Sequence, residues 1–350
     1  MKNTDMEALV RPNIRALCPY STARDEYRGP VGVFLDANES PWPTGFNRYP
    51  DPHQKALKAA LSEIKGVPAE QIFVGNGSDE AIDVLIRVFC TPGQDSIAAI
   101  APSYGMYEVA AAINDIEVRK VQLGKDYALP VEELLAACDE GTKAMFLCSP
   151  NNPTGNAFSL GDIRFLLDNF GGIVVVDEAY IDFSSVPSLL GELDSHPNLV
   201  VLQTLSKAWG MAALRVGLAF ASEYIIKVMS EVKYPYNINA EAQRLALEAL
   251  SSPIGGRVAE TKAQRALVAS FLEGCGFVQK VWPSEANFIL VKVTDADSLY
   301  AHLLADGIIV RNRSRVKGCE GCLRITIGTP EENLKLKQSL SDYEKGNIRR

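Results

Sequence analysis

The sequence predicts an α/β fold, with a mostly parallel sheet flanked by helices and a smaller α+β domain after it. Short apolar runs alternate with amphipathic segments of helix length from about residue 55 to 235. The strand-like runs are continuously apolar, which is typical of strands covered on both faces. After residue 236 the order changes to two helical stretches, then strand, strand, helix, strand, strand and helix.

Periodicity and turn residues place the elements in order. The first long helix is expected within 51–65, where Leu57, Leu61 and Ile64 share one face, and Gly66 ends it. The expected strands are 71–74, 96–100, 116–121, 144–148, 173–176, 199–202 and 216–220. The expected helices are 78–90, 104–113, 130–138, 159–169, 239–250 and 255–274.

Three parts of the chain follow from this pattern. We expect an N-terminal arm over 1–30 that joins the small domain, a large domain over 31–235 and a small C-terminal domain over 236–350.

Composition excludes several classes of function. The chain has 350 residues, 47% of them hydrophobic and 22% charged, which is typical of a globular protein. The net charge of −8 argues against nucleic acid as a partner. The apolar runs are too short to cross a membrane, and the N-terminus lacks the apolar stretch of a secretory signal. We therefore expect a cytoplasmic protein.

Cysteine and histidine usage predicts no metal centre. Seven cysteines are scattered without a secretory signal, which indicates reduced thiols. Cys319 and Cys322 form a lone CxxC just before a strand-like run, and we interpret them as packing residues because a zinc site needs further ligands. The three histidines are isolated from one another.

The segment 204–217 carries the most informative lysine. Lys207 follows an apolar strand and precedes a stretch of small residues, where a merely solubilising charge would be poorly placed. Burial lowers the pKa of an amine, which is what a Schiff-base lysine needs. Thr204, Ser206 and Arg215 flank it, and two hydroxyls with a guanidinium can hold a phosphate dianion.

A second phosphate-binding element is predicted at the glycine-containing turn 75–80. Gly75 and Gly77 precede the helix expected at 78–90, so backbone N–H groups there can face an anion. Ser78 and Asp79 could equally form an ordinary helix cap. A dinucleotide fingerprint is excluded because its sixth position is Glu80.

Two polar loops follow predicted strands. Ser149–Gly155 contains Asn152, and Asp177 with Tyr180 follows the strand at 173–176. Ligands of open α/β sheets bind at the carboxyl ends of the strands. A carboxylate buried there requires a cationic partner, and a pyridinium nitrogen would serve.

Together these motifs resemble the fold-type-I pyridoxal-phosphate aminotransferases, and finer features are similar to the histidinol-phosphate aminotransferase family. The resemblance covers about residues 11–330. The motifs that carry it are Arg15-Ala-Leu-Cys-Pro-Tyr20, Asn38-Glu39, Asn47-Arg-Tyr49-Pro-Asp51, Pro102-Ser-Tyr104-Gly-Met-Tyr107, Asn152-Pro-Thr-Gly155, Asp177-Glu-Ala-Tyr180, Thr204-Leu-Ser-Lys207, Gly307-Ile-Ile-Val-Arg311 and Cys322-Leu-Arg324-Ile-Thr.

The resemblance implies a role for each matching residue around pyridoxal 5′-phosphate. Lys207 would form the aldimine and move the proton, and Asp177 would pair with the pyridinium nitrogen. The remaining cofactor contacts would be Asn152 and Tyr180 to the phenolate oxygen, Tyr104 on the ring face, and Ser78, Asp79, Thr204, Ser206 and Arg215 to the phosphate. Tyr49 would reach the phosphate from the neighbouring subunit, which implies a homodimer with a shared active site.

The implied reaction is transamination of histidinol phosphate with 2-oxoglutarate, giving imidazole acetol phosphate and glutamate by a ping-pong cycle. Tyr20, Arg311 and Arg324 would bind the substrates, with Arg324 meeting the phosphate ester or the α-carboxylate in turn. Arg313, Arg315 and Lys317 are interpreted as residues of a solvated edge strand.

Other readings of the same motifs stay open. A threonine-phosphate decarboxylase of similar sequence also binds a phosphorylated amine, and a broad aromatic aminotransferase would result from a loose imidazole pocket. Transcription regulators with this fold carry an added helix-turn-helix domain, for which the residues before the core leave no room.

Overall fold

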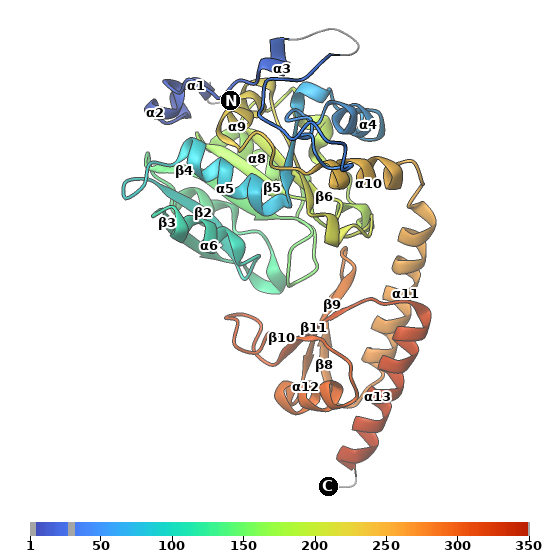
Figure 1. The fold of residues 1–350 in the computed structure, drawn as a ribbon. Coiled ribbons are helices and arrows are strands. Elements are labelled where there is room, and N and C mark those ends of the chain that lie inside the picture. The colour runs from blue at the N-terminus through green and yellow to red at the C-terminus, as the bar shows by residue number, and fades with distance from the viewer. Residues whose placement is uncertain (1–4, 27–31, 349–350) are drawn as a thin grey trace.

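The computed structural model describes residues 5–26 and 32–348, and the strands in these ranges form two sheets. The seven-stranded sheet has the order β1-β7-β6-β5-β4-β2-β3, and the four-stranded sheet has the order β10-β11-β9-β8. Figure 1 shows the first sheet with its helices above the second. No helix in the described part of the chain is long and apolar enough to cross a membrane.

The seven-stranded sheet is mostly parallel, as predicted. Its strands are β1 (Ile72–Asn76), β2 (Ser96–Ala101), β3 (Glu117–Gln122), β4 (Thr142–Cys148), β5 (Ile173–Asp177), β6 (Leu199–Thr204) and β7 (Val216–Phe220). Only β7 runs against its neighbours, β1 and β6. The carboxyl ends of β1, β4, β5 and β6 therefore meet the start of β7 at one edge, where the predicted polar loops gather.

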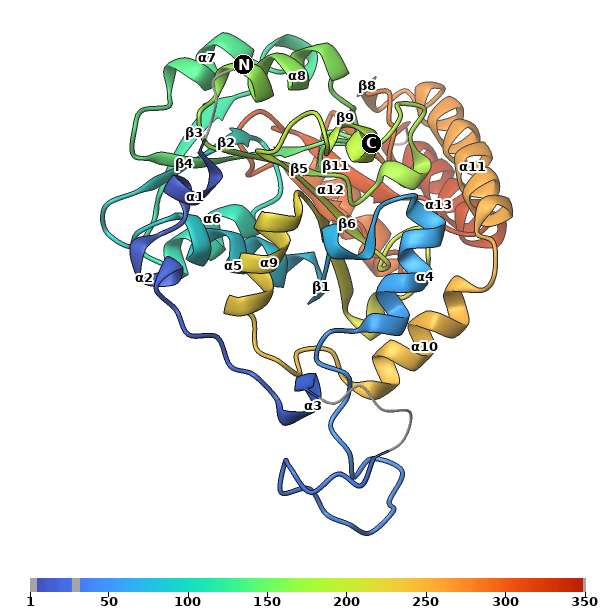
Figure 2. The same cartoon turned by 90° about the horizontal axis from the view of Figure 1, so that it is seen from above.

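Helices cover both faces of this sheet, which explains its continuously apolar strands (Figure 2). One face packs against α4 (Lys55–Lys65), α7 (Val131–Ala136), α8 (Leu160–Asn169) and α10 (Ala240–Leu250). The other packs against α5 (Ser78–Phe89), α6 (Met106–Ile113) and α9 (Glu223–Val232). Gly66 ends α4 in the left-handed conformation (φ 67°), as its position predicted.

The four-stranded sheet is antiparallel and follows the predicted order of elements. Its strands are β8 (Val278–Val281), β9 (Phe288–Val293), β10 (Arg311–Asn312) and β11 (Cys322–Thr326). The long helix α11 (Gly255–Glu273) precedes β8, α12 (Ala296–Ala305) lies between β9 and β10 in the chain, and α13 (Pro330–Ile348) follows β11. Leu323 and Ile325 face a core formed with α11, α12 and α13. Because side chains alternate along a strand, Cys322 and Arg324 point to the opposite face, toward the seven-stranded sheet.

Two of the expected domain boundaries differ from the way the elements pack in the structure. α10 lies beyond the boundary expected at 235/236, yet Ala242, Ala246 and Leu250 are buried in the core of the seven-stranded sheet. The apolar face of α10 packs against that sheet, so the boundary predicted from the change in element order lies too early in the chain.

The arm expected at 1–30 does not join the four-stranded sheet in its described part. α1 (Met6–Leu9) and α2 (Pro12–Arg15) lie beside α5, and Val10 is buried in the core on that face. Arg11 donates from its backbone to the Val88 carbonyl at 3.0 Å and from its side chain to the Arg87 carbonyl at 2.8 Å. These contacts satisfy carbonyls at the end of α5, where a cation is favoured. α3 (Ala23–Glu26) follows.

Candidate active site

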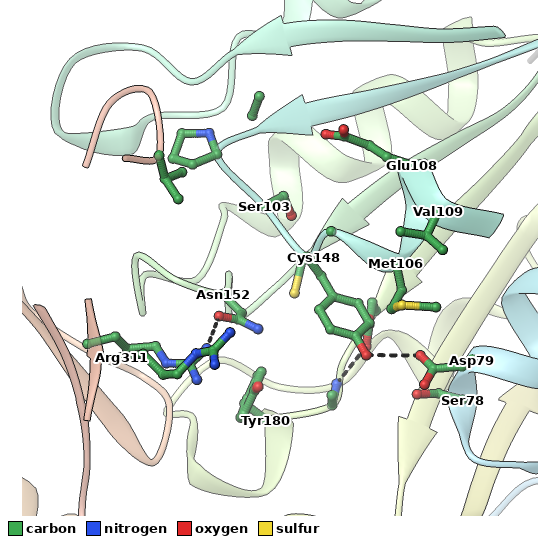
Figure 3. A pocket seen from close by; sticks show the side chains of 18 of the residues that line it. Ser78, Asp79, Ser103, Met106, Glu108, Val109, Cys148, Asn152, Tyr180 and Arg311 are labelled. Carbon is green, nitrogen blue, oxygen red and sulfur yellow. Dashed lines mark hydrogen bonds between the residues drawn. The ribbon is translucent and has the colours of Figure 1, made fainter. Parts of the chain in front are cut away.

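One large cavity lies where the two sheets face each other. Its volume is about 1080 Å³, and it is lined by loops at the carboxyl ends of the large sheet and by β10, β11 and the loop between them. The predicted site residues that line it are Ser78, Asp79, Tyr104, Asn152, Asp177, Tyr180, Thr204, Ser206, Lys207, Arg215, Arg311 and Arg324. Figure 3 shows Ser78 and Asp79 at one side of the cavity and Arg311 near Asn152 at the other.

Two predicted residues lie elsewhere. Tyr20 is 72% exposed and belongs to a separate hollow that also contains His53 and Lys233. Tyr49 is half exposed and stacks on Tyr236, with ring centroids 4.5 Å apart. Neither side chain reaches the cavity of its own chain, because the segments that carry them run along the outside of the large sheet.

A cup whose geometry suits an anion lies where β7 touches the start of α5. A Cβ on Gly217 would lie 2.0 Å from the Ser78 nitrogen, and a Cβ on Gly77 would lie 2.6 Å from Arg215 Nη2. Only glycines permit this approach. Arg215 is in the left-handed conformation (φ 57°), and its carbonyl accepts from the Gly77 N–H at 2.7 Å.

The first turn of α5 is open toward this cup. No side-chain hydrogen bond caps it, so the alternative in which Ser78 and Asp79 form an ordinary cap is not what the structure shows. The Asp79 carboxylate instead accepts from the Tyr104 hydroxyl at 3.0 Å and lies 4.0 Å from Arg215. Uncapped N–H groups, a helix dipole and a guanidinium together suit a phosphate.

Lys207 projects into the open part of the cavity, 5.7 Å above the centre of the Tyr180 ring. Its side chain is exposed within the cavity. Partial removal of the amine from water by the cavity lining, and next the positive charge of Arg324, lower the pKa of Lys207. A lysine with a lowered pKa is more often neutral, which both nucleophilic attack and proton abstraction require.

Asp177 is buried at the end of β5 and held in place by two hydrogen bonds. Tyr107 donates its hydroxyl to Oδ2 at 2.8 Å, and the Ala179 N–H donates to Oδ1 at 3.1 Å. Burial raises the pKa of Asp177 to about 6, and the Tyr107 hydrogen bond opposes that rise. A buried carboxylate of this kind gains from a cationic partner.

Tyr107 was given no role by the sequence argument. It is fully buried and stacks on Phe146, with centroids 5.0 Å apart. Its position in the Pro102–Tyr107 motif, three residues after Tyr104, was the available signal.

The far wall of the cavity carries Arg311, Arg313 and Arg324, with Arg315 and Lys317 beside them. Arg311 and Arg324 are directly opposite each other in the β10–β11 pair, and Arg324 donates to Asn152 Oδ1. Arg313, Arg315 and Lys317 also line the cavity, which corrects their interpretation as residues of a solvated edge strand. Burial is the main cause that lowers the pKa of both Arg313 and Arg324. Within the described residues, no carboxylate forms an ion pair with Arg311, Arg313 or Arg324.

The CxxC pair is a packing feature, as predicted. Cys319 and Cys322 are buried free thiols in a cluster with Leu290 and Tyr127, and the Tyr127 hydroxyl donates to the Gly318 carbonyl at 2.8 Å.

These residues fit pyridoxal 5′-phosphate. A cup suited to a phosphate, an accessible amine and a buried carboxylate line one cavity, and among the described residues Asp177 has no cation paired with it, a place that a ring nitrogen would fill. A fold of this type with such a site defines a pyridoxal-phosphate-dependent enzyme of fold type I.

The chain belongs to the aminotransferase class I and II family, whose model matches residues 34–340. A histidinol-phosphate aminotransferase from Parabacteroides distasonis is 54% identical over 342 residues, covering 97% of this chain and 99% of that protein. The chain is therefore an aminotransferase, and its cofactor is pyridoxal 5′-phosphate.

Two solved structures share the fold. The histidinol-phosphate aminotransferase from Clostridium acetobutylicum has a TM-score of 0.79 at 24% identity, covering 86% of this chain and 92% of that chain. The L-threonine-O-3-phosphate decarboxylase from Porphyromonas gingivalis has a TM-score of 0.68 at 24% identity, covering 85% and 91%. At this identity the similarity concerns the fold alone.

Proposed function

We propose that this aminotransferase transfers the amino group of L-histidinol phosphate to 2-oxoglutarate, giving imidazole acetol phosphate and glutamate in histidine biosynthesis. The observation that carries the proposal is a cavity that contains Lys207 and, on its far wall, arginines that pair with no carboxylate of the described residues. The name of the relative from Parabacteroides distasonis supports the same substrate.

The cofactor contacts follow from the side chains around the cavity. When bound, pyridoxal 5′-phosphate supplies a ring that stabilises negative charge on the carbon next to the amino group. The phosphate would be held by Ser78, the Asp79 N–H, Thr204, Ser206 and Arg215. Asp177 would hold the ring nitrogen, Asn152 and Tyr180 the phenolate oxygen, and Tyr104 the ring face.

Lys207 would hold and move the proton. The pKa of Lys207 is lowered by burial and by Arg324. Its amine can therefore accept a proton from the α-carbon of the amino donor in one half-reaction and return a proton to the α-carbon of the product in the other. The Tyr180 ring lies beside the amine, 5.7 Å from ring centre to Nζ. Lys207 and Asp177, with Tyr180, are thus the proposed catalytic residues.

Substrate anions would bind at Arg324 and Arg311. The two guanidiniums lie on one face of neighbouring strands, and each offers a planar fork to a carboxylate or phosphate. Histidinol phosphate and 2-oxoglutarate would occupy this wall in alternate half-reactions. Tyr20 stays a predicted substrate contact, and reaching the cavity would require Tyr20 of a partner subunit or a different arrangement of its segment.

We infer a homodimer in which Tyr49 completes the cavity of the partner. The loop around residues 32–50 projects from the large sheet and exposes Val33, Leu35, Trp42 and Phe46, each at least 75% exposed (Figure 2). Such a set of apolar side chains is typical of a surface that another chain covers.

Glu39 fixes the shape of this loop. Its carboxylate accepts from Arg24 at 2.6 Å, from Arg48 at 2.7 Å and from the Tyr49 N–H at 2.6 Å. We infer that a second copy of this chain covers the loop, because this would place Tyr49 of one subunit near the proposed phosphate site of the other. Mixing inactive Tyr49→Ala and Lys207→Ala chains should restore part of the activity, since one site per heterodimer would be intact. No recovery after proven subunit exchange would refute the sharing.

The free thiols of the chain support a cytoplasmic location. All seven cysteines lie in the described part of the chain and are free. Free buried thiols are typical of reducing compartments.

The experiment that tests the substrate follows one half-reaction. The cofactor-loaded enzyme is mixed with histidinol phosphate, and conversion to the pyridoxamine form is recorded by absorbance together with any release of CO2. The proposal requires conversion without CO2. Release of CO2 from threonine phosphate, with no reaction of histidinol phosphate, would instead show a decarboxylase. Equal rates with histidinol phosphate and unphosphorylated aromatic amino acids would show a broad aminotransferase.

A further inference from the structure

Arg313 adds a third, partly buried guanidinium to those of Arg311 and Arg324 on the cavity wall, whereas Arg315 beside them is exposed. Arg313 follows Arg311 by two residues, and its backbone N–H donates to the Cys322 carbonyl at 2.8 Å, which continues the β10–β11 ladder. Side chains alternate along a strand, so Arg311 and Arg313 lie on the same face of the sheet. Arg324, which pairs with Arg311 across the two strands, lies on that face too. The intervening Asn312 points away and donates to Asp297 on α12 at 2.6 Å.

The surroundings of Arg313 leave its charge uncompensated. Its Nε is buried without a hydrogen-bond partner, as is Nε of Arg324. Burial and then the neighbouring Arg311 lower the pKa of Arg313, and no carboxylate acts on it within the described residues. Gathering three like charges is unfavourable in the free protein, so the arrangement indicates an anion that binds among them.

The loop that follows Arg313 holds it in place. The Arg313 carbonyl accepts from the Val316 N–H at 2.8 Å, and the Val316 carbonyl accepts from the Cys319 N–H at 2.8 Å. The buried Cys319 and the hydrogen bond from Tyr127 to Gly318 fasten the loop to the rest of the protein. The backbone that carries Arg313 is thus fixed before substrate arrives, which lowers the cost of ordering on binding.

We infer that Arg313 is a specificity-determining residue that binds the phosphate group of a phosphate-ester substrate and contributes little to binding of glutamate. This inference rests on the proposed function and identifies which residue separates its two substrates. A phosphate monoester carries a charge of about −1.5 to −2 at neutral pH and three acceptor oxygens, so it can engage three guanidiniums. A carboxylate carries one charge and two oxygens, which a single fork already satisfies.

The test compares two half-reactions in single turnover, using cofactor-loaded wild type and Arg313→Gln. We expect kcat/KM with histidinol phosphate to fall about ten- to a hundredfold, and kcat/KM with glutamate to change less than about threefold. Arg313→Lys keeps the charge but not the fork, and should recover part of the loss. Arg164→Gln is the matched control, because Arg164 pairs with Glu192 on the outer surface and should leave both reactions unchanged.

Binding of inorganic phosphate gives a readout that is independent of turnover. Titration of the loaded enzyme should show weaker phosphate binding in Arg313→Gln than in wild type, whereas binding of succinate should be equal. Equal losses with both amino donors, or no loss with either, would overturn the inference while the proposed function stands. If wild type does not react with histidinol phosphate at all, the proposed function fails and the inference fails with it.

Discussion

Burial raises the pKa of Asp177, and the hydroxyl of Tyr107 opposes that rise. Tyr107→Phe isolates the effect of the hydroxyl. The substitution keeps the ring stacked on Phe146 and removes only the donor that lies 2.8 Å from Asp177 Oδ2. A hydrogen bond to a charged group contributes about 1.5–3 kcal/mol, and one pKa unit corresponds to about 1.36 kcal/mol. Loss of the hydroxyl should therefore raise the Asp177 pKa from about 6 to about 7–8.

The sign of the effect follows from the charged form that the cofactor needs. In the proposed role the ionised carboxylate would pair with the ring nitrogen, and this charged form is lost as the pH falls through the pKa of Asp177. Cofactor affinity of wild type should weaken below about pH 6, whereas that of Tyr107→Phe should weaken from about one to two pH units higher. Near neutral pH, the variant should bind the cofactor about two- to tenfold more weakly.

The assay titrates cofactor-free protein with pyridoxal 5′-phosphate over a range of pH and follows the visible absorbance. Tyr343→Phe is the control, since Tyr343 is buried near Phe277 beside the four-stranded sheet, far from Asp177. Profiles of wild type and Tyr107→Phe that coincide would refute the reasoning, because the hydroxyl would then have no influence on the carboxyl.

Four further predictions concern single side chains. Lys207→Ala should lose activity by several orders of magnitude and no longer fix the cofactor to its peptide after borohydride treatment; labelling of another lysine would contradict the assignment. Asp177→Asn should bind the cofactor more weakly than wild type but still retain it at saturating concentration, and should lower kcat strongly; activity within about twofold of wild type would mark Asp177 as structural. Arg324→Lys should slow the half-reactions with histidinol phosphate and glutamate about ten- to a few hundredfold, because the fork is lost; normal turnover with either substrate would disprove a shared anion site. The hydrogen bond from Arg24 is the main cause that lowers the pKa of Glu39 to about 2, so its stabilising effect is present above pH 4.5 and is lost as the pH falls toward 2. Thermal unfolding of Glu39→Gln should consequently depend less on pH in that window than unfolding of wild type.

Secondary structure was largely decided by local sequence. Each strand of the large sheet was predicted within about two residues, because continuous apolar runs bounded by turn residues have few other solutions in an α/β protein. The helix α9 was not predicted. Its apolar residues Ile225, Ile226, Val228 and Met229 are nearly continuous, and such a pattern does not separate a buried helix from a strand.

Local motifs also predicted most of the cavity. Lys207, Asp177 and the turn at 75–80 each follow a strand, and parallel strands bring their carboxyl ends to one edge. The order of these motifs was enough to recognise the family, which the comparisons confirmed. The positions of Tyr20 and Tyr49 were not accessible in this way, because nothing local shows which chain's cavity they face.

The sequence by itself determined the class of fold, the phosphate cup and the lysine at a strand end, since each depends on neighbours within a few residues. Only the tertiary structure decided which distant groups meet. The Tyr107–Asp177 hydrogen bond joins residues 70 positions apart, and the Arg324–Asn152 contact joins residues 172 positions apart. From the sequence alone Arg313 was interpreted as a solvated charge, whereas the pairing of β10 with β11 places it in the cavity near Arg324. Burial and charge are properties of the assembled cavity, and they set the pKa values on which its chemistry depends.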